Sequence, residues 1–356
     1  MIPATASFVA FLGPGQPQQL RVAPLPELGP GELLVRIACA TLCRSDLSTW
    51  SGARTETTPT ILGHEMVGHL AAFGPNAPRH DLDGAPLATG DRITWAIYAA
   101  DPAAPEARAG MPQKAAGRCK YGHEPLRDGH GFHGGLAEWI VLRRHTPVVR
   151  VPAAVPDVVA ALLNCAGASM AGALRLCGDV RGKTVLVSGL GALGLFGCAM
   201  ARVAGADVVG VDPDPARVAL AAAFGARGRL AGAVGSVVPE RHQVALECSG
   251  APVAMEQAVA GLALGGIAVF VGAVMPARPI ALDGEHLVRS LLTVRGLHNY
   301  TGTDLVAAVR FVQEHGARFP FATLVEDGHR LADADRAFAH AIAARPVRVA
   351  IRPWQE

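Results

Sequence analysis

The stretch "KTVLVSGLGALG", residues 183–194, decides the fold of the second half of the chain. It begins as a short apolar strand and ends in a G-x-G-x-x-G turn that opens a helical stretch. Gly189 permits the tight turn, Gly191 lets the backbone approach a pyrophosphate, and Gly194 lets helix and strand pack closely. The free N–H groups at the start of the helix would face phosphates. We therefore predict a dinucleotide-binding site, with a glycine-rich turn in an ordinary βαβ unit as the alternative.

An acidic residue in the right place favours the dinucleotide site. Asp212 ends the next predicted strand, "DVVGVD" (207–212). Its carboxylate can accept hydrogen bonds from both adenosine ribose hydroxyls and would repel a 2′-phosphate, so we expect NAD rather than NADP. The other candidate cofactor-binding residues in this half of the chain are Ala192, Leu193, Arg217 and Val271.

The pattern of strands and helices divides the chain into two parts. After residue 183, helical stretches alternate with apolar strands such as "HQVALECSG" (242–250) and "GGIAVFVGAV" (265–274), which predicts a parallel sheet. The Ala-rich stretch 220–234 is expected to be helix and loop. Earlier, short strands alternate with turns, and the expected strands are 31–40, 91–99 and 134–142. The prediction is an α/β chain with a β-rich domain and a doubly wound cofactor domain.

Composition narrows the function. Half of the 356 residues are hydrophobic and 17% are charged, which excludes a disordered chain. The formal net charge of +2 predicts no general attraction to nucleic acid or acidic membranes. No signal peptide begins the chain and no uninterrupted apolar run reaches the length of a membrane span, so we expect a soluble cytoplasmic protein. The 7 cysteines are scattered, unlike a disulfide framework.

The stretch "ILGHEMVGH" (61–69) raises the question of a zinc protease. That class carries H-E-x-x-H, with both histidines on one helical face. His64 and His69 are five positions apart, which turns them about 140° around a helix axis. Gly63 and Gly68 also weaken a helix. If His64 binds a metal, its partners must come from elsewhere in the chain, whereas His69 is expected to be structural.

Together with the dinucleotide motif, "CRSDLSTWSG" (43–52) and "GHEMVGH" resemble the medium-chain zinc-dependent alcohol dehydrogenases over essentially the whole chain. The resemblance implies a GroES-like catalytic domain, residues 1–166 and 299–356, and a Rossmann domain, residues 167–298. It also implies an NAD-dependent enzyme that acts on an alcohol through zinc. We expect a homodimer or homotetramer, with the run 265–274 supplying the sheet edge between copies.

The resemblance carries metal and catalytic roles onto single residues. Cys43, His64 and Cys165 match the zinc ligands, with one position left for substrate or water. Asp46 matches the acid that orients the ligand histidine. Glu65 matches the acid beside the metal, which can approach it or replace the water ligand.

Further matches concern the proton route and the cofactor. Ser45 matches the residue that takes the hydroxyl proton. Many members have a histidine three positions later that passes the proton to solvent, but here Ser48 stands there, and it would act with water or a ribose hydroxyl. Arg44 and Arg348 match arginines that bind the pyrophosphate.

A second, structural zinc is not expected. Many members hold it with four cysteines, and the matching positions here are Asp101, Ala104, Ala107 and Ala115. Cys119 lies nearby, but one thiolate cannot close a zinc site. A replacement site formed by loop histidines is a weak alternative, and its candidates would be His123, His130 and His133.

A narrower resemblance concerns the substrate. "MPQKAAGRCKYGHE" (111–124) and "RGLHNY" (295–300) are similar to a subgroup of phosphonate-catabolism-associated alcohol dehydrogenases. It implies a small polar alcohol, with an anionic group met by Lys114, Lys120, His123 or His298. A cyclitol or sugar-alcohol dehydrogenase stays open, as does a catalytically silent NAD-binding scaffold.

Overall fold

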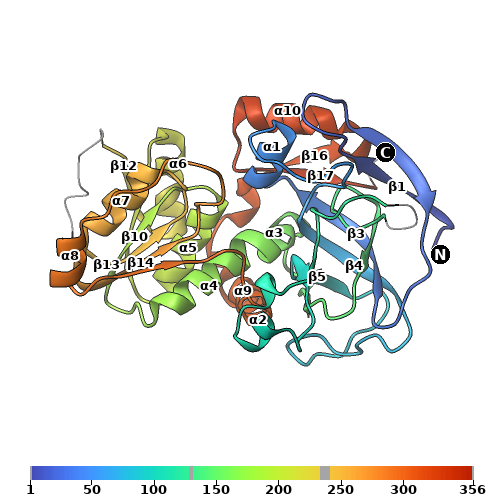
Figure 1. Cartoon of the computed structure of the whole chain (residues 1–356), viewed down its shortest axis with the longest axis horizontal. Coiled ribbons are helices and arrows are strands. Elements are labelled where there is room, and N and C mark those ends of the chain that lie inside the picture. Colours follow the sequence, from blue (N-terminus) through green and yellow to red (C-terminus); the bar gives the residue numbers. More distant parts are fainter. Residues whose placement is uncertain (1, 128–130, 233–240, 355–356) are drawn as a thin grey trace. The chain divides into compact units, whose positions relative to one another are not determined.

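The computed structural model describes residues 2–127, 131–232 and 241–354, and it divides into two compact units (Figure 1). The first unit consists of residues 1–165, 301–313 and 321–356, and the second of residues 166–300 and 314–320. The sequence places 314–320 with the first domain instead. This segment joins the second unit, where Phe319 stacks on Phe224 with ring centroids 6.3 Å apart.

The second unit is built on a parallel sheet with the strand order β12-β11-β10-β13-β14-β15. Its strands are β10 (Thr184–Ser188), β11 (Asp207–Asp212), β12 (Arg227–Leu230), β13 (His242–Glu247), β14 (Leu262–Phe270) and β15 (Thr293–Gly296). Its helices are α4 (Ala168–Cys177), α5 (Ala192–Val203), α6 (Pro215–Leu220), η3 (Ala221–Phe224), α7 (Pro252–Ala260), α8 (Gly284–Arg289) and η4 (Gly316–Arg318). The strand order reverses at β10, which is the switch point of a doubly wound sheet. The predicted Rossmann fold is confirmed.

Two details of this sheet differ from the sequence-based expectation. The stretch 220–234 contains strand β12, whose mainly exposed sequence "RGRL" carries no apolar signature. Strand β14 pairs with β13 on one side and β15 on the other, so 265–274 is not the free edge expected to join copies of the chain. Among the described strands β15 is the edge on that side, and exposed Val288 and Leu291 precede it. Association between copies stays a prediction.

The glycines of the G-x-G-x-x-G turn have different surroundings. Gly189 has φ +90°, a conformation that side chains rarely adopt. A Cβ on Gly194 would lie 1.9 Å from the carbonyl oxygen of Gly189, so helix α5 can start against β10 only with glycine there. A Cβ on Gly191 would meet nothing within 4 Å. The turn therefore keeps open space at Gly191 and none at Gly194.

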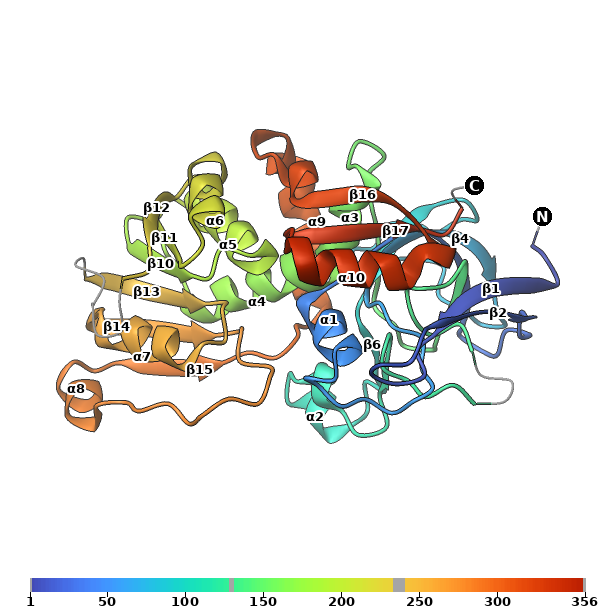
Figure 2. The same ribbon diagram turned by 90° about the horizontal axis from the view of Figure 1, so that it is seen from above.

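The first unit is β-rich. Its main sheet has the order β16-β17-β3-β4-β5-β9, with β8 also paired to β3. Its strands are β1 (Thr5–Ala10), β2 (Gln19–Pro24), β3 (Leu33–Thr41), β4 (Glu65–Phe73), β5 (Arg92–Trp95), β6 (Tyr98–Ala99), β7 (Cys119–Lys120), β8 (Trp139–Leu142), β9 (Val148–Arg150), β16 (Val325–Arg330) and β17 (Arg348–Arg352). Figure 2 shows helix α10 (Ala334–Ala344) lying along β17. The predicted β-rich domain is confirmed.

Short helices connect these strands. They are α1 (Arg44–Trp50), α2 (Pro105–Arg108), η1 (Pro112–Lys114), α3 (Asp157–Leu162), the π-helix η2 (Leu163–Gly167), α9 (Gly302–His315), η5 (Phe321–Leu324) and η6 (Leu331–Asp333). Two expected strands are shorter than predicted. The stretch 91–99 breaks into β5 and β6, because the N–H of Ala96 turns to the carbonyl of Pro147. The stretch 134–142 becomes a strand only from Trp139, since Gly134 packs directly against the backbone of Ile61.

One helical run has the length of a membrane span. Asp157–Cys177, formed by α3, η2 and α4, is 21 residues long with a mean hydropathy of 1.5. By length and composition this helix could cross a membrane, although Asp157, Asn164 and Arg175 interrupt it, so the expectation that no uninterrupted apolar run is this long is not contradicted. However, 72% of the apolar window is buried inside the structure, as in the core helix of a globular protein.

The contrast between two glycines gives a stability test. Gly194→Ala is expected to lower the free energy of unfolding by about 1–3 kcal/mol, because its Cβ would overlap the backbone of Gly189. Gly191→Ala is the matched control and is expected to leave stability nearly unchanged while weakening dinucleotide binding. Thermal denaturation and a titration with NAD measure the two effects. Equal stability losses in both variants would contradict this account of the turn.

Candidate functional site

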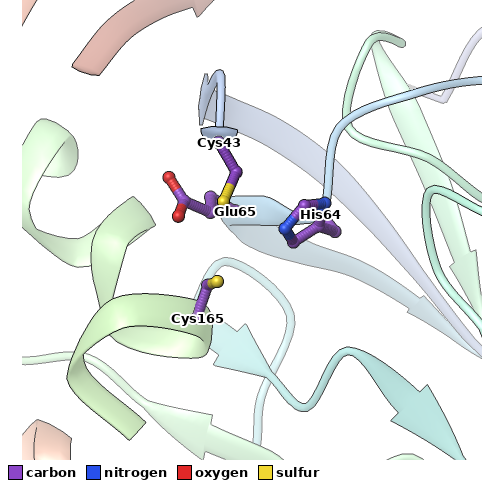
Figure 3. Close-up of side chains that lie close together, drawn as sticks. All are labelled: Cys43, His64, Glu65 and Cys165. Carbon is purple, nitrogen blue, oxygen red and sulfur yellow. The ribbon is translucent and has the colours of Figure 1, made fainter. Parts of the chain in front are cut away.

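Four side chains from three segments converge inside the first unit. The ligand atoms of Cys43, His64, Glu65 and Cys165 all lie within 4.8 Å of one another (Figure 3). Cys43 follows strand β3, His64 directly precedes strand β4, Glu65 begins that strand, and Cys165 lies on the π-helix η2. The three predicted zinc ligands and Glu65 are thus brought together although they are far apart in sequence.

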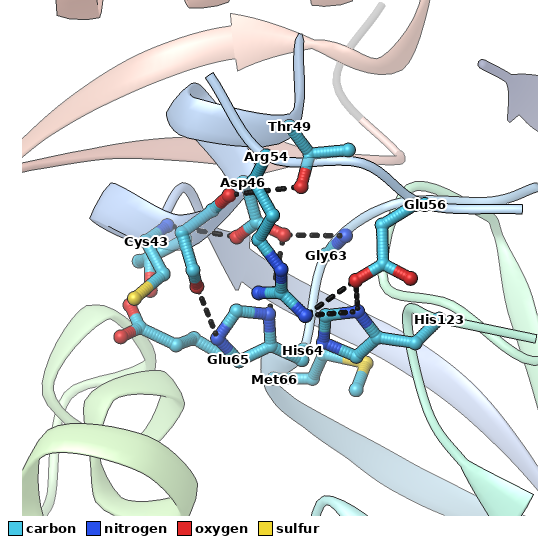
Figure 4. A network of polar contacts seen from close by, with 12 residues as sticks. Cys43, Asp46, Thr49, Arg54, Glu56, Gly63, His64, Glu65, Met66 and His123 are labelled. Carbon is cyan, nitrogen blue, oxygen red and sulfur yellow. Dashed lines mark hydrogen bonds and ion pairs between the residues drawn. The ribbon is translucent and has the colours of Figure 1, made fainter. Parts of the chain in front are cut away.

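Asp46 ties the first two segments together. Its Oδ2 accepts a hydrogen bond of 2.9 Å from the backbone N–H of Cys43, which begins helix α1. Its Oδ1 accepts from the backbone N–H of Gly63 at 3.3 Å and lies 3.1 Å from Nδ1 of His64 (Figure 4). Asp46 is 1% exposed, so these partners replace water around its carboxylate.

The contact with Asp46 sets the orientation of the His64 ring. A carboxylate can only accept, so Nδ1 carries a proton and Nε2 is the nitrogen that can bind a metal. Nε2 lies 3.4 Å from the hydroxyl of Ser45, which is on the first turn of helix α1. The structure therefore places Ser45 beside the metal ligands. Ser48 lies half-buried on the same helix, and its predicted role in proton transfer stays a prediction.

Cys165 is placed by an irregularity in a long helix. The backbone changes from α to π form over Leu163–Gly167, a feature often found at functional sites. The side chain of Asn164 then reaches the start of strand β4, accepting from the N–H of Met66 and donating to the carbonyl of His64, both at 3.1 Å. Sequence reasoning missed Asn164, because a buried asparagine carries no pattern apart from its place beside Cys165.

Glu65 is held by two partners. Arg348 donates to its carboxylate through Nε at 2.8 Å and through Nη2 at 2.9 Å, and Thr41 donates at 2.7 Å. Glu65 is fully buried and Arg348 is 6% exposed. Arg348 was predicted to bind a pyrophosphate, and its guanidinium instead pairs with Glu65 here. Its predicted contact with the cofactor stays a prediction.

The buried charges perturb one another. A hydrogen bond with Cys165 lowers the pKa of Cys43, and Arg348 lowers it further against the effect of burial. Burial lowers the pKa of His64, but the Asp46 carboxylate overcomes this and raises it to about 10. Burial raises the pKa of Glu65 while Arg348 opposes the shift. The site therefore favours a thiolate at Cys43, the form that binds metals.

This donor set fits zinc. Thiolates and imidazole are preferred zinc ligands, and three protein ligands leave one position for a substrate. Among residues 2–127, 131–232 and 241–354, no other group of three or more His, Cys, Asp or Glu side chains converges closely enough to hold a metal ion. Zinc held by Cys43, His64 and Cys165 would act as a Lewis acid on an alcohol oxygen.

The region in which many family members hold a second zinc contains short helices and a single cysteine. Residues 101–115 contain the short helices α2 and η1, and Cys119 lies in β7, where burial raises its pKa to about 12. His133 is buried, and His130 lies outside the described residues. The structure does not place His133 and His123 in a common ligand group within the part of the chain that it describes.

His123 belongs instead to a polar cluster beside the metal ligands. Its Nδ1 lies 2.8 Å from Oε1 of Glu56, and Arg54 forms an ion pair with the same carboxylate (Figure 4). Burial lowers the pKa of His123 to about 4, although Glu56 opposes the shift. Arg54 and Glu56 were not predicted from the sequence, because nothing in "SGARTETTP" (51–59) distinguishes them from surface charges.

The predicted cofactor-binding residues gather at one edge of the second unit. Gly189, Asp212 and Val271 lie at the carboxyl ends of the parallel strands β10, β11 and β14, where such sheets bind nucleotides. Gly191 precedes helix α5, on which Ala192, Leu193 and Gly194 form the first turn. The carboxylate of Asp212 accepts from the N–H groups of Leu190 at 2.7 Å and Asp214 at 2.9 Å, which fixes its direction beside the turn.

Two arginines complete the set of predicted cofactor contacts. Arg217 lies on helix α6, which follows β11, and Arg44 is exposed at the start of helix α1 in the first unit. Their cofactor contacts stay predictions.

Comparison with known families agrees with this geometry. Residues 29–153 match the alcohol dehydrogenase GroES-like domain, and residues 192–314 match the zinc-binding dehydrogenase domain. The chain is 30% identical to an L-threonine 3-dehydrogenase of Ruegeria pomeroyi over 292 residues, which cover 78% of this chain and 79% of that protein. An L-threonine 3-dehydrogenase of Streptomyces avermitilis is 28% identical over 353 residues, which cover 93% of this chain and 94% of that protein.

Solved structures share the fold. An alcohol dehydrogenase from Thermotoga maritima superposes with a TM-score of 0.87 at 24% identity, covering 98% of this chain and 99% of that one. A zinc-binding dehydrogenase from Sinorhizobium meliloti, solved with NADP, superposes with a TM-score of 0.85 at 22% identity, covering 99% and 100%. The chain belongs to the medium-chain zinc-dependent alcohol dehydrogenase family, whose enzymes act on a CH–OH group with a nicotinamide cofactor.

Proposed function

We propose that this enzyme transfers a hydride between a small polar alcohol and NAD in the cytoplasm, using a single zinc ion per chain. The observation that carries the proposal is the convergence of Cys43, His64 and Cys165, with Asp46 behind the histidine. The seven cysteines are all free, which suits a reducing compartment. A catalytically silent scaffold would need none of these ligands.

The chain's own residues each have a task in this reaction. Asp46 holds His64 so that Nε2 points into the site, and Asn164 holds the helix that carries Cys165. Ser45 lies where its hydroxyl can accept the proton of the alcohol and pass it on. The Glu65–Arg348 pair keeps a carboxylate beside the ligands without an unpaired buried charge.

A metal assay tests the zinc proposal. We expect elemental analysis of the purified chain to give one tightly bound zinc. Cys43→Ala is expected to remove the zinc and the turnover, while NAD binding measured by titration stays within about twofold, because different residues hold the dinucleotide. Cys119→Ala is the matched control and is expected to keep the zinc. Two tightly bound zinc ions in the wild-type chain would refute the single-site proposal.

The preference for NAD rests on Asp212. Its carboxylate stands at the end of β11, where it would bind the ribose hydroxyls and repel a 2′-phosphate. Asp212→Gly is expected to reduce the NAD/NADP ratio of kcat/KM by about tenfold or more, which corresponds to about 1.4 kcal/mol. Asp214→Gly, which removes a carboxylate two residues further on, is the control. A wild-type preference for NADP would show that Asp212 has been assigned the wrong role.

The surroundings of Lys120 support the proposal that the substrate carries an anionic group. Lys120 is half-buried, and burial together with the nearby Arg54 guanidinium lowers its pKa to about 8. No described residue forms a hydrogen bond or ion pair with this ammonium, although the Glu56 carboxylate partly opposes the lowering of its pKa. We propose that an anion carried by the alcohol would pair with this cation. Lys114 is exposed on η1, and the substrate roles proposed for it and for His298 lack such an observation.

Charge and pH test this role. Lys120 is cationic below pH 8 and neutral above it, so the KM of an anionic alcohol should rise between pH 7 and pH 9. A hydroxyalkylsulfonate is the suitable probe, because its charge is constant over this range, and a hydroxyalkylphosphonate is compared with it. Lys120→Met is expected to raise KM for both about tenfold with little change in kcat, since the contact binds ground and transition states alike.

Lys183→Met is the control for the loss of a lysine outside the first unit. A preference of the wild-type enzyme for uncharged aliphatic or aromatic alcohols would exclude the anionic substrate and leave the zinc and NAD proposals standing.

A cyclitol or sugar alcohol is the second candidate substrate class, which the polar cluster around His123 favours.

A further inference from the structure

Cys165 is carried by the least regular part of a long helical run. After helix α3 the backbone takes the π form over Leu163–Gly167, and helix α4 follows directly. A π turn contains one residue more than an α turn, so it rotates the residues that it carries around the helix axis. Figure 3 shows Cys165 on this turn, close to the segment that carries His64 and Glu65. The direction of the Cys165 side chain therefore depends on the form of the turn.

Asn164, the residue before Cys165, binds the backbone of that other segment. Its Oδ1 accepts from the N–H of Met66, and its Nδ2 donates to the carbonyl of His64, both at 3.1 Å. These partners fix the orientation of the amide, because an N–H can only donate and a carbonyl can only accept. The two contacts lie on either side of Glu65, as the contacts from a residue of a parallel neighbouring strand would. Asn164 thus takes the place of a strand partner at the beginning of β4.

The contacts of this amide are buried. Asn164 and Met66 have no exposed surface, and His64 is 2% exposed. If the amide were removed, a buried N–H and a buried carbonyl would each lose a hydrogen bond without water to replace it. The carbonyl of Met66 is bound by a different side chain, Thr94, whose hydroxyl donates to it at 3.1 Å. Two side chains therefore hold this strand residue, and Asn164 is the one that lies on the helix of Cys165.

The place of Cys165 along the helix makes such a link useful. Helix α3, before the π turn, packs against strands β3 and β4 of the first unit. Cys165 is the last residue of this unit, and the helix continues into the second unit from Ala166. Neighbouring side chains on a helix diverge around its axis, so a fixed side chain at Asn164 also fixes the direction of Cys165. The amide ties the turn to the unit that contains the other candidate ligands.

We propose that Asn164 is a positioning residue for the metal: its amide holds the π turn beside strand β4, and this position decides whether Cys165 can share a metal with the other ligands. The inference rests on the proposed zinc site and adds a residue that touches neither the metal nor the substrate. An apolar side chain of similar size would leave the turn free to relax toward α geometry. Cys165 would then turn away from Cys43 and His64, and the metal would have two protein ligands in place of three.

Cobalt and zinc binding to the purified chain test the inference without measuring turnover. Co²⁺ can replace Zn²⁺ at thiolate sites, and its thiolate charge-transfer absorption grows with the number of bound thiolates. Wild type should show the absorption of two thiolates, and Asn164→Leu should show about half of it, because one of the two cysteines is lost. Asn164→Leu should also bind zinc about 10- to 100-fold more weakly in competition with a chelating dye, as for other residues that orient a metal ligand.

Two further variants separate positioning from stability. Thr94→Val is the matched control, because it removes a buried hydrogen bond from Met66 but leaves the link to the turn of Cys165 intact. It should keep the wild-type cobalt absorption and zinc affinity. Asn164→Ala carries the test if Asn164→Leu does not fold, since alanine favours a helix and leaves space for a water molecule at the two backbone groups. It should show the same reduced absorption, and thermal denaturation of each metal-free variant checks that it is folded.

The outcomes are distinct. Wild-type cobalt absorption and zinc affinity in a folded Asn164→Leu or Asn164→Ala variant would overturn the inference and leave the zinc site standing. An equal loss in Thr94→Val would also overturn it, because Asn164 would then act through the stability of strand β4 rather than through Cys165. If the wild-type chain binds neither cobalt nor zinc, the proposed function fails, and the inference fails with it.

Discussion

The carboxylate of Asp46 is the interaction on which the metal site depends. It bridges the backbone of Cys43, the backbone of Gly63 and the ring of His64, so one side chain joins the end of strand β3 to the start of strand β4. Two ligands that are 21 positions apart thereby acquire a fixed separation, and the histidine acquires the tautomer that presents Nε2. Because Asp46 is buried, any loss of these partners would leave a charge without solvent or counterpart, which makes the arrangement rigid.

Close backbone packing extends this rigidity to the surroundings. Gly63 has φ +91°, its carbonyl accepts from the N–H of Gly135 at 2.7 Å, and Gly122 packs against the same carbonyl. Three segments meet there without side chains between them. Such contacts cannot slide by a few tenths of an ångström without a clash, so His123 is held beside His64 as firmly as the ligands themselves. The glycines of "LGHE", "YGHE" and "HGGL" thus have a common physical role that the separate motifs do not reveal.

The sequence predicted the two domain types, and its resemblance to the family named the four side chains that the structure brings together, because each motif is short and can be recognised locally. The Rossmann turn, Asp212, and the pair Cys43 and Asp46 need only a few neighbouring residues to be recognised. Sequence patterns did not predict the features that depend on contacts between residues far apart in the chain. Strand β12 has an exposed polar sequence and exists only because β11 offers it an edge, and β14 lies inside the sheet because β15 pairs with it. Arg54, Glu56 and Asn164 come from segments without a motif, and only the fold brings them to the site.

Arg348 shows how one side chain can limit two predicted roles. Its guanidinium donates two hydrogen bonds to Glu65, one to Cys43 and one to the carbonyl of Val347. A guanidinium has five N–H donors, so these four hydrogen bonds leave one donor. A pyrophosphate would have to share the remaining donor or displace Glu65. If Glu65 were displaced, its buried carboxylate would lose its counter-charge and would be drawn toward the nearest cation, which in a loaded site is the metal. Two predicted roles are therefore coupled. A contact of Arg348 with the cofactor would make the approach of Glu65 to the metal more favourable. The ion pair between Arg348 and Glu65 opposes each of these roles.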